Sequence, residues 1–116
     1  MLNSEQLSKV VVHAMEELKA QNIKVLDVRN ISGVTDYLVI SSGTSNRQVS
    51  AIADKVADDA KKSGQRILGI EGKNPSEWVL VDLGDVVAHI MQPHIRDFYQ
   101  LERLWGDLKE TPRLEH

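Results

Sequence analysis

Apolar residues recur at helical spacing in two segments of the chain, and both segments are predicted to form amphipathic helices. The first begins at Asn3 or the serine after it, which are good N-cap residues, and runs to about Gln21. The second begins at Ser45, whose spacing from Gln48 is that of a capping box, and ends before Gly64, which suits the left-handed position after a helix. The apolar stripes consist of Leu7, Val11, Ala14, Met15 and Leu18 in the first helix and of Val49, Ile52, Ala53, Val56, Ala57 and Ala60 in the second.

Three short segments rich in β-forming residues, 24–29, 37–41 and 66–70, are predicted to be strands. The first alternates between apolar and polar positions, as a half-buried strand does, and Val25 is expected to face the core. Only a short turn separates the first two strands, which favours an antiparallel pair. A loop is expected at 71–76.

Two further strands, 78–83 and 86–91, flank Gly84 and Asp85 and predict a β-hairpin. A two-residue turn fixes the register, and side chains then alternate between the two faces. One face is wholly apolar and is expected to lie against the core: Val79, Val81, Leu83, Val86, Ala88 and Ile90. The other, which we call the mixed face, carries Trp78, Leu80, Asp82, Val87, His89 and Met91.

The mixed face of the hairpin is open to two interpretations. Pro93 is predicted to start a last helix that runs to about Leu108, and this helix could cover the face and bury Trp78. Alternatively the face stays partly exposed, and an apolar patch with polar edges is typical of a protein-docking surface. In that case three residues of the last helix would border it: Arg96, Tyr99 and Glu102.

The predicted order α-β-β-α-β-β-β-α indicates a single α/β domain, with a mixed β-sheet of about five strands flanked by helices. Residues 1–113 are assigned to this domain. Residues 114–116, Leu-Glu-His, look like the remnant of a purification tag. An edge strand near the hairpin could pair two copies into a homodimer.

The chain has 116 residues, is 41% hydrophobic and contains no cysteine, so it can form a core but no disulfide, cysteine zinc site or catalytic thiol. It begins with no signal peptide, and no apolar run approaches the roughly 18 residues of a membrane span. We therefore expect a cytoplasmic protein without membrane contact. Its net charge of −3 argues against nucleic-acid binding driven mainly by electrostatics.

The candidate catalytic and metal-binding residues form no motif. His13, His89 and His94 lack the spacing of a histidine metal pair, so no metal is expected, and no G-x-S-x-G turn supports a hydrolase. The segment 42–48 enters a helix and could bind phosphate through backbone N–H groups, although no Walker lysine follows it. It supports an alternative interpretation, a small nucleotide-binding or nucleotidyl-transferring enzyme; the preferred interpretation needs no cofactor.

Three segments in order, 36–48, 71–91 and 96–105, together resemble the ribosomal silencing factor (iojap) family, and the resemblance extends over about residues 4–108. It implies a nucleotidyltransferase-like α/β fold that has lost its enzyme chemistry. The sequence agrees, because Asp82 and Asp85 are three positions apart and form no Asp-x-Asp pair for Mg²⁺.

The resemblance also implies a function. It predicts a translational repressor that binds the fourteenth protein of the large ribosomal subunit at the intersubunit face. Bound there, it would sterically block joining of the small subunit and lower translation under nutrient limitation. Contact with ribosomal RNA stays open, and direct RNA binding through Lys and Arg of the second helix is a third alternative.

The mixed face is the surface expected to bind this partner. Ribosomal proteins are typically basic, so acidic side chains at its border would favour encounter and orientation. The predicted partner-binding residues are Trp78, Leu80, Asp82, Asp85, His89, Met91, Arg96, Tyr99 and Glu102.

Overall fold

The computed structural model of the chain describes residues 2–31 and 33–99. Their elements follow the predicted order, which confirms the fold class. The bounds are α1 Ser4–Glu17, β1 Gln21–Asp27, β2 Tyr37–Ser42, α2 Asn46–Lys62, β3 Gly69–Glu71, β4 Trp78–Asp82, β5 Val86–Met91 and α3 Pro93–Tyr99. None of the described helices is long and apolar enough to span a lipid bilayer.

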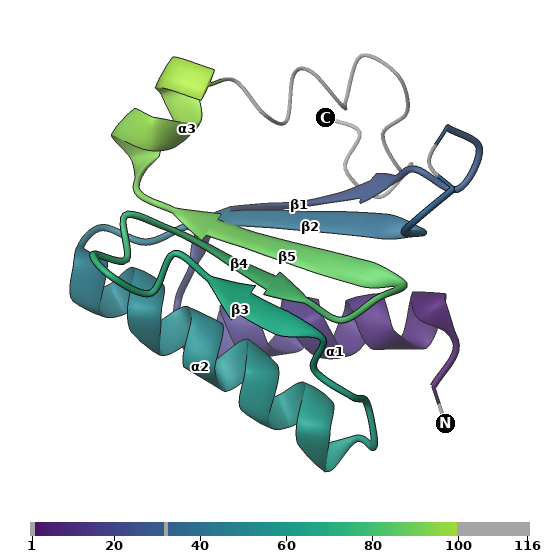
Figure 1. Ribbon diagram of the computed structural model, residues 1–116. Coiled ribbons are helices and arrows are strands. Elements are labelled where there is room, and N and C mark those ends of the chain that lie inside the picture. The colour runs from purple at the N-terminus through teal and green to yellow at the C-terminus, as the bar shows by residue number, and fades with distance from the viewer. Residues whose placement is uncertain (1, 32, 100–116) are drawn as a thin grey trace.

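Within the described residues, the strands form one five-stranded mixed sheet in the order β1-β2-β5-β4-β3. β2 and β5 are parallel, whereas β1–β2, β5–β4 and β4–β3 are antiparallel, as expected for the first pair. Helices α1 and α2 cover one face of the sheet, and α3 lies on the other side (Figure 1). The larger apolar cluster combines side chains of α1 and α2 with inward residues of the strands.

Helix α1 begins where expected but ends earlier than the predicted Gln21. Asn3 is the N-cap, and its side chain accepts the backbone N–H of Gln6 at 2.7 Å. In return, the Gln6 side chain accepts the backbone N–H of Asn3 at 3.0 Å. At the other end, Lys19 adopts a positive φ of 62°, and the following Ala20 N–H bonds the Met15 carbonyl at 2.9 Å. This left-handed turn usually contains glycine, so the lysine gave no signal of it in the sequence.

Helix α2 confirms both predicted ends. Ser45 Oγ accepts the backbone N–H of Gln48 at 3.1 Å, as the capping prediction requires. The capping box is one-sided, because the Gln48 side chain accepts the N–H of Thr44, at 2.6 Å, instead of that of the cap residue. Gly64 has a φ of +89°, and Gln65 N–H closes the turn on the Ala60 carbonyl at 2.9 Å.

Two of the predicted strands, 24–29 and 66–70, differ from their observed bounds by more than one residue, and β2 and β4 differ by one. β1 begins at Gln21 rather than at 24, through a bulge at which Asn22 has a positive φ of 52°. β3 is restricted to Gly69–Glu71. Val25 lies in the main core cluster and is 3% exposed, as expected. The expectation that this strand is half-buried is wrong at Leu26, which is 0% exposed and packs in the second apolar cluster. The sheet is covered on both faces at this strand.

The hairpin has the predicted register. Trp78 faces Met91 across the pair, and Leu83 N–H bonds the Val86 carbonyl at 3.0 Å around the turn. Gly84 supplies the positive φ, +88°, that the first turn position of such a hairpin needs. The six residues of the predicted apolar face are all at most 1% exposed.

The opposite side of the sheet carries a second, smaller apolar cluster. Its buried members are Leu26, Val28, Leu38, Ile40 and Met91, and Trp78, Val87 and Ile95 pack against it. Pro93 starts α3, as predicted. The expected continuation of this helix to Leu108, with Leu101, Glu102 and Trp105, and the expected tag remnant at 114–116 lie outside the described residues. β1 and β3 are the sheet edges in the described part, and pairing of two copies through an edge stays a prediction.

Candidate mixed-face binding site

The mixed face of the hairpin is partly exposed and partly core. Trp78, Leu80, Asp82 and His89 are all half-buried. Met91 is 0% exposed, which corrects the expectation that it belongs to an exposed centre. It is the last residue of β5, two positions before the start of α3, and packs in the second cluster. Both earlier interpretations of this face therefore hold in part: one end is buried, and the rest stays accessible.

Trp78 and His89 form the polar contact at the centre of this face. They lie diagonally across the β4–β5 pair, and the indole Nε1–H donates to His89 Nδ1 at 3.1 Å. The ring centroids are 6.1 Å apart. Because Nδ1 accepts, the neutral imidazole carries its proton on Nε2. Burial lowers the pKa of His89 to about 4, so the ring is neutral at physiological pH.

The two predicted acids of the hairpin differ in role. Asp82 Oδ1 accepts the N–H of Gly84 at 2.9 Å, so this carboxylate also holds the turn. Asp85 is exposed at the tip, and its carbonyl accepts the N–H groups of Asp36 and Tyr37 at 2.8 and 3.1 Å. The tip is thereby anchored to β2, and the Asp85 side chain projects from a fixed backbone.

Arg96 does not border the surface. It is 4% exposed, and a terminal guanidinium nitrogen donates to Ser42 Oγ at 2.9 Å. Pro93 begins α3 soon after the end of β5, and Arg96 then lies against the end of β2. The sequence spacing had instead suggested that Arg96 faces solvent. Arg96 therefore fixes α3 on the sheet. The side chain of Tyr99, and Glu102 as a whole, lie outside the described part of the chain.

A hollow of about 250 Å³ adjoins the tryptophan, lined by Glu71, Gly72, Trp78 and Leu80. Gly72 has a φ of +88°, and a Cβ at this position would lie 2.1 Å from the Trp78 carbonyl oxygen. Only glycine lets the loop approach β4 this closely. Neither Glu71 nor Gly72 was predicted as a site residue, because the contact depends on β3 pairing beside β4.

Comparison with known proteins decides the family. The profile described as "Ribosomal silencing factor during starvation" matches residues 1–116. The chain belongs to the ribosomal silencing factor family. A ribosomal silencing factor of Haemophilus influenzae is 46% identical over 100 residues, covering 86% of this chain and 98% of the relative.

Further relatives agree with this family assignment. A crystal structure of a Chromobacterium violaceum protein superposes with a TM-score of 0.89 at 41% identity, covering 90% of this chain and 88% of that one. The mouse protein named "Mitochondrial assembly of ribosomal large subunit protein 1" is 36% identical over 99 residues, covering 83% of this chain and 43% of the relative.

In this silencing-factor chain, three backbone N–H donors of the segment 42–48 already have partners within the protein. Gly43 N–H bonds the Met91 carbonyl at 3.1 Å, Thr44 N–H bonds the Gln48 side chain, and Gln48 N–H bonds Ser45. A Cβ at Gly43 would lie 3.0 Å from a Val49 methyl, so the glycine serves close packing. Helix capping and close packing therefore explain why Gly43, Thr44, Ser45 and Gln48 occur in this segment, without a bound phosphate.

The third alternative, RNA binding through α2, relies on its basic side chains. Lys62 pairs with Asp58 at 3.1 Å, and Lys55 pairs with Glu17 at 3.1 Å and with Asp59 at 3.3 Å. Acidic neighbours on α1 and α2 therefore neutralise two of its lysines. This arrangement reduces the positive potential that phosphate binding needs.

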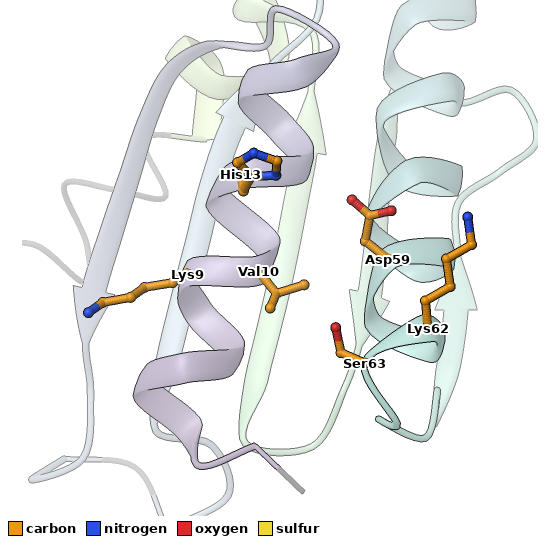
Figure 2. A pocket seen from close by; sticks show the side chains of 6 residues that line it. All are labelled: Lys9, Val10, His13, Asp59, Lys62 and Ser63. Carbon is orange, nitrogen blue, oxygen red and sulfur yellow. The ribbon is translucent and has the colours of Figure 1, made fainter.

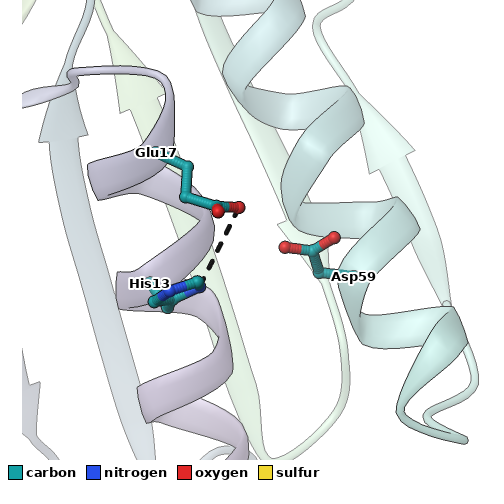
Figure 3. Close-up of side chains that lie close together, drawn as sticks. All are labelled: His13, Glu17 and Asp59. Atoms are coloured by element: carbon teal, nitrogen blue, oxygen red, sulfur yellow. Dashed lines mark ion pairs between the residues drawn. The ribbon is translucent and has the colours of Figure 1, made fainter.

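The helical side of the molecule carries a hollow of about 430 Å³ between α1 and α2, lined by Lys9, Val10, His13, Asp59, Lys62 and Ser63 (Figure 2). Beside it, the possible ligand atoms of His13, Glu17 and Asp59 lie within 4.8 Å of one another (Figure 3). The sequence alone gave no sign of this group, because His13 and Glu17 lie on α1 and Asp59 lies on α2. Lys55 donates to both carboxylates and lowers the pKa of Glu17, so the group forms an ion-paired seam between the helices.

Proposed function

We propose that this protein is a cytoplasmic translational repressor that binds the large ribosomal subunit and sterically blocks joining of the small subunit under nutrient limitation. Family membership supports a silencing role, and the name of the mouse relative supports a link to the large subunit. The proposed contact is the fourteenth protein of that subunit, at the face that meets the small subunit. Repression by occlusion requires only tight binding at that face.

The observation that carries this proposal is the accessible part of the mixed face. Trp78, Leu80 and His89 offer apolar area with one fixed polar contact, and tryptophan is enriched among residues that dominate binding energy. Asp82 and Asp85 add negative charge at the turn end, which suits a basic ribosomal protein. Met91 and Arg96 support the surface from within.

A Trp78→Ala variant tests this surface. Central aromatic anchors contribute about 2 kcal/mol or more, so we expect affinity for purified large subunits to fall about 30-fold. Co-sedimentation over a range of subunit concentrations would measure it. Val10→Ala, on the helical side of the sheet, is the matched control and should bind as the unmodified protein does.

Circular dichroism and thermal unfolding would establish that both variants are folded. A folded Trp78→Ala protein that co-sediments as well as the unmodified protein would contradict the assignment of the mixed face. The same preparations, added to separated subunits, would show whether loss of binding restores subunit joining.

A further inference from the structure

We infer that the hollow lined by Glu71, Gly72, Trp78 and Leu80 receives one long cationic side chain, lysine or arginine, from the protein partner. The inference rests on the proposed function, since it assigns a role to a hollow on the binding face. It adds Glu71 as a residue that determines which partner side chain is accepted.

The register of the sheet builds the hollow. Glu71 of β3 pairs directly with Leu80 of β4, so their side chains share a face, and Trp78 lies two positions along the same strand. Gly72 then turns with a φ of +88° and brings its backbone against the Trp78 carbonyl. The hollow is therefore a fixed consequence of strand pairing and of a glycine that no other residue can replace without a shift.

The hollow carries negative charge and no positive charge among the described residues that line it. Among the described residues that line it, Glu71 is the sole ionisable group, and its exposed carboxylate has no hydrogen-bond or ion-pair partner in the described part of the chain. The nearby Lys73 does not neutralise it, because its ammonium pairs with Asp54 of α2 at 2.5 Å. Asp82 lies farther along the same face of β4 and adds a second negative charge.

The walls of the hollow suit the stem of such a side chain. Leu80 offers aliphatic surface, and the Trp78 ring is held by its hydrogen bond to His89. Lysine and arginine pack their methylene stems on apolar surface while the charged head stays polar, and their cations are attracted to an indole face. An apolar side chain would desolvate Glu71 without compensation, and an acidic one would be repelled.

The size of the hollow favours a single side chain over a small molecule. Its volume of about 250 Å³ lies below the roughly 300–1,000 Å³ typical of pockets for small ligands. It also opens on the surface where Trp78 is accessible, so a side chain could enter from a docked protein.

A pair of charge-neutralising variants tests the inference. Glu71→Gln and Glu77→Gln each remove one exposed negative charge, but only Glu71 lines the hollow. We expect Glu71→Gln to weaken binding to purified large subunits about fivefold at low salt, and Glu77→Gln to change it less than about twofold. The difference between them should shrink at higher ionic strength, as screening weakens the charge pair.

The outcomes separate this inference from the proposed function. Equal affinities of the two glutamine variants, whether both reduced or both unchanged, would overturn the role of Glu71. If Trp78→Ala still weakens binding in that case, the mixed face stands and only the cationic occupant is wrong. If Trp78→Ala also binds normally, the proposed surface itself fails. A larger loss in Glu71→Lys than in Glu77→Lys would independently support the inference.

Discussion

At the scale of the residue, His89 shows how burial changes the meaning of a side chain. An isolated histidine on a strand could be a metal ligand, a catalytic base or a pH sensor. Here Nδ1 accepts from the Trp78 indole, and burial keeps the ring neutral. Its role is to orient the tryptophan, which is the residue we expect to anchor the partner.

This environment predicts a pH-dependent stability. The folded-state pKa of His89 is about 4 and its reference pKa is 6.5, so between these values the unfolded chain binds more protons. The contribution of His89 is complete above pH 6.5 and is lost as the pH falls towards 4. Between pH 7 and pH 5, we expect this group to lower the free energy of unfolding by about 1 to 2 kcal/mol.

Urea unfolding at both pH values, compared with His89→Gln, would measure this contribution. The glutamine carries no titratable group and retains an acceptor for Trp78. The unmodified protein should lose more stability than the variant over this range. Equal losses would show that His89 does not titrate in this way.

At the scale of the element, the end of α1 depends on backbone geometry that its sequence does not announce. Lys19 occupies the left-handed position that Gly64 occupies after α2. A side chain there costs free energy that glycine avoids. Pattern reasoning located the end of α2, which has a glycine, and extended α1 too far because it lacks one.

Lys19→Gly should therefore stabilise the protein, by about 0.5 to 1 kcal/mol. The matched control is Lys9→Gly, the same substitution inside α1, which should destabilise by about 1 kcal/mol. Chemical denaturation of both variants would report the two free energies of unfolding. A destabilised Lys19→Gly protein would contradict this account of the helix end.

The loop between β3 and β4 gives a second prediction at this scale. Gly72 and Gly64 have almost the same φ, +88° and +89°, but an added Cβ meets the Trp78 carbonyl at Gly72 and nothing within 4 Å at Gly64. Gly64→Ala should cost about 1 kcal/mol, from the backbone conformation alone. Gly72→Ala should cost about 3 kcal/mol, because the loop must also move.

Thermal and urea unfolding of the two alanine variants would measure this difference directly. Similar losses of stability would mean that the loop moves away from β4 at little cost. In that case Gly72 would be needed for its φ and not for the close approach.

At the scale of the whole molecule, the sheet separates two surfaces. α1 and α2 cover one side, and the ion pair of Lys55 on α2 with Glu17 on α1 joins them there. The other side carries the second apolar cluster, α3 and the accessible part of the mixed face. The half-buried Trp78 and Leu80, which we propose as the apolar centre of the binding surface, lie on this second side.

The sequence by itself determined the fold class, the order of the elements, the ends of α2 and the hairpin register. These features depend on local patterns: helical spacing, capping residues, and a two-residue turn that fixes which side chains share a face. The family resemblance also came from short segments in order, and the profile match confirmed it.

Only the tertiary structure decided which residues of the expected surface are accessible. Met91 and Arg96 were assigned to that surface from sequence, but both are buried. Met91 packs in the second apolar cluster, which Ile95 of α3 also contacts, and Arg96 lies against Ser42 of β2. The hollow at Glu71 and Gly72 likewise arises from β3 pairing beside β4. Burial depends on what packs over a position from elsewhere in the chain, and side-chain alternation along one strand cannot supply that information.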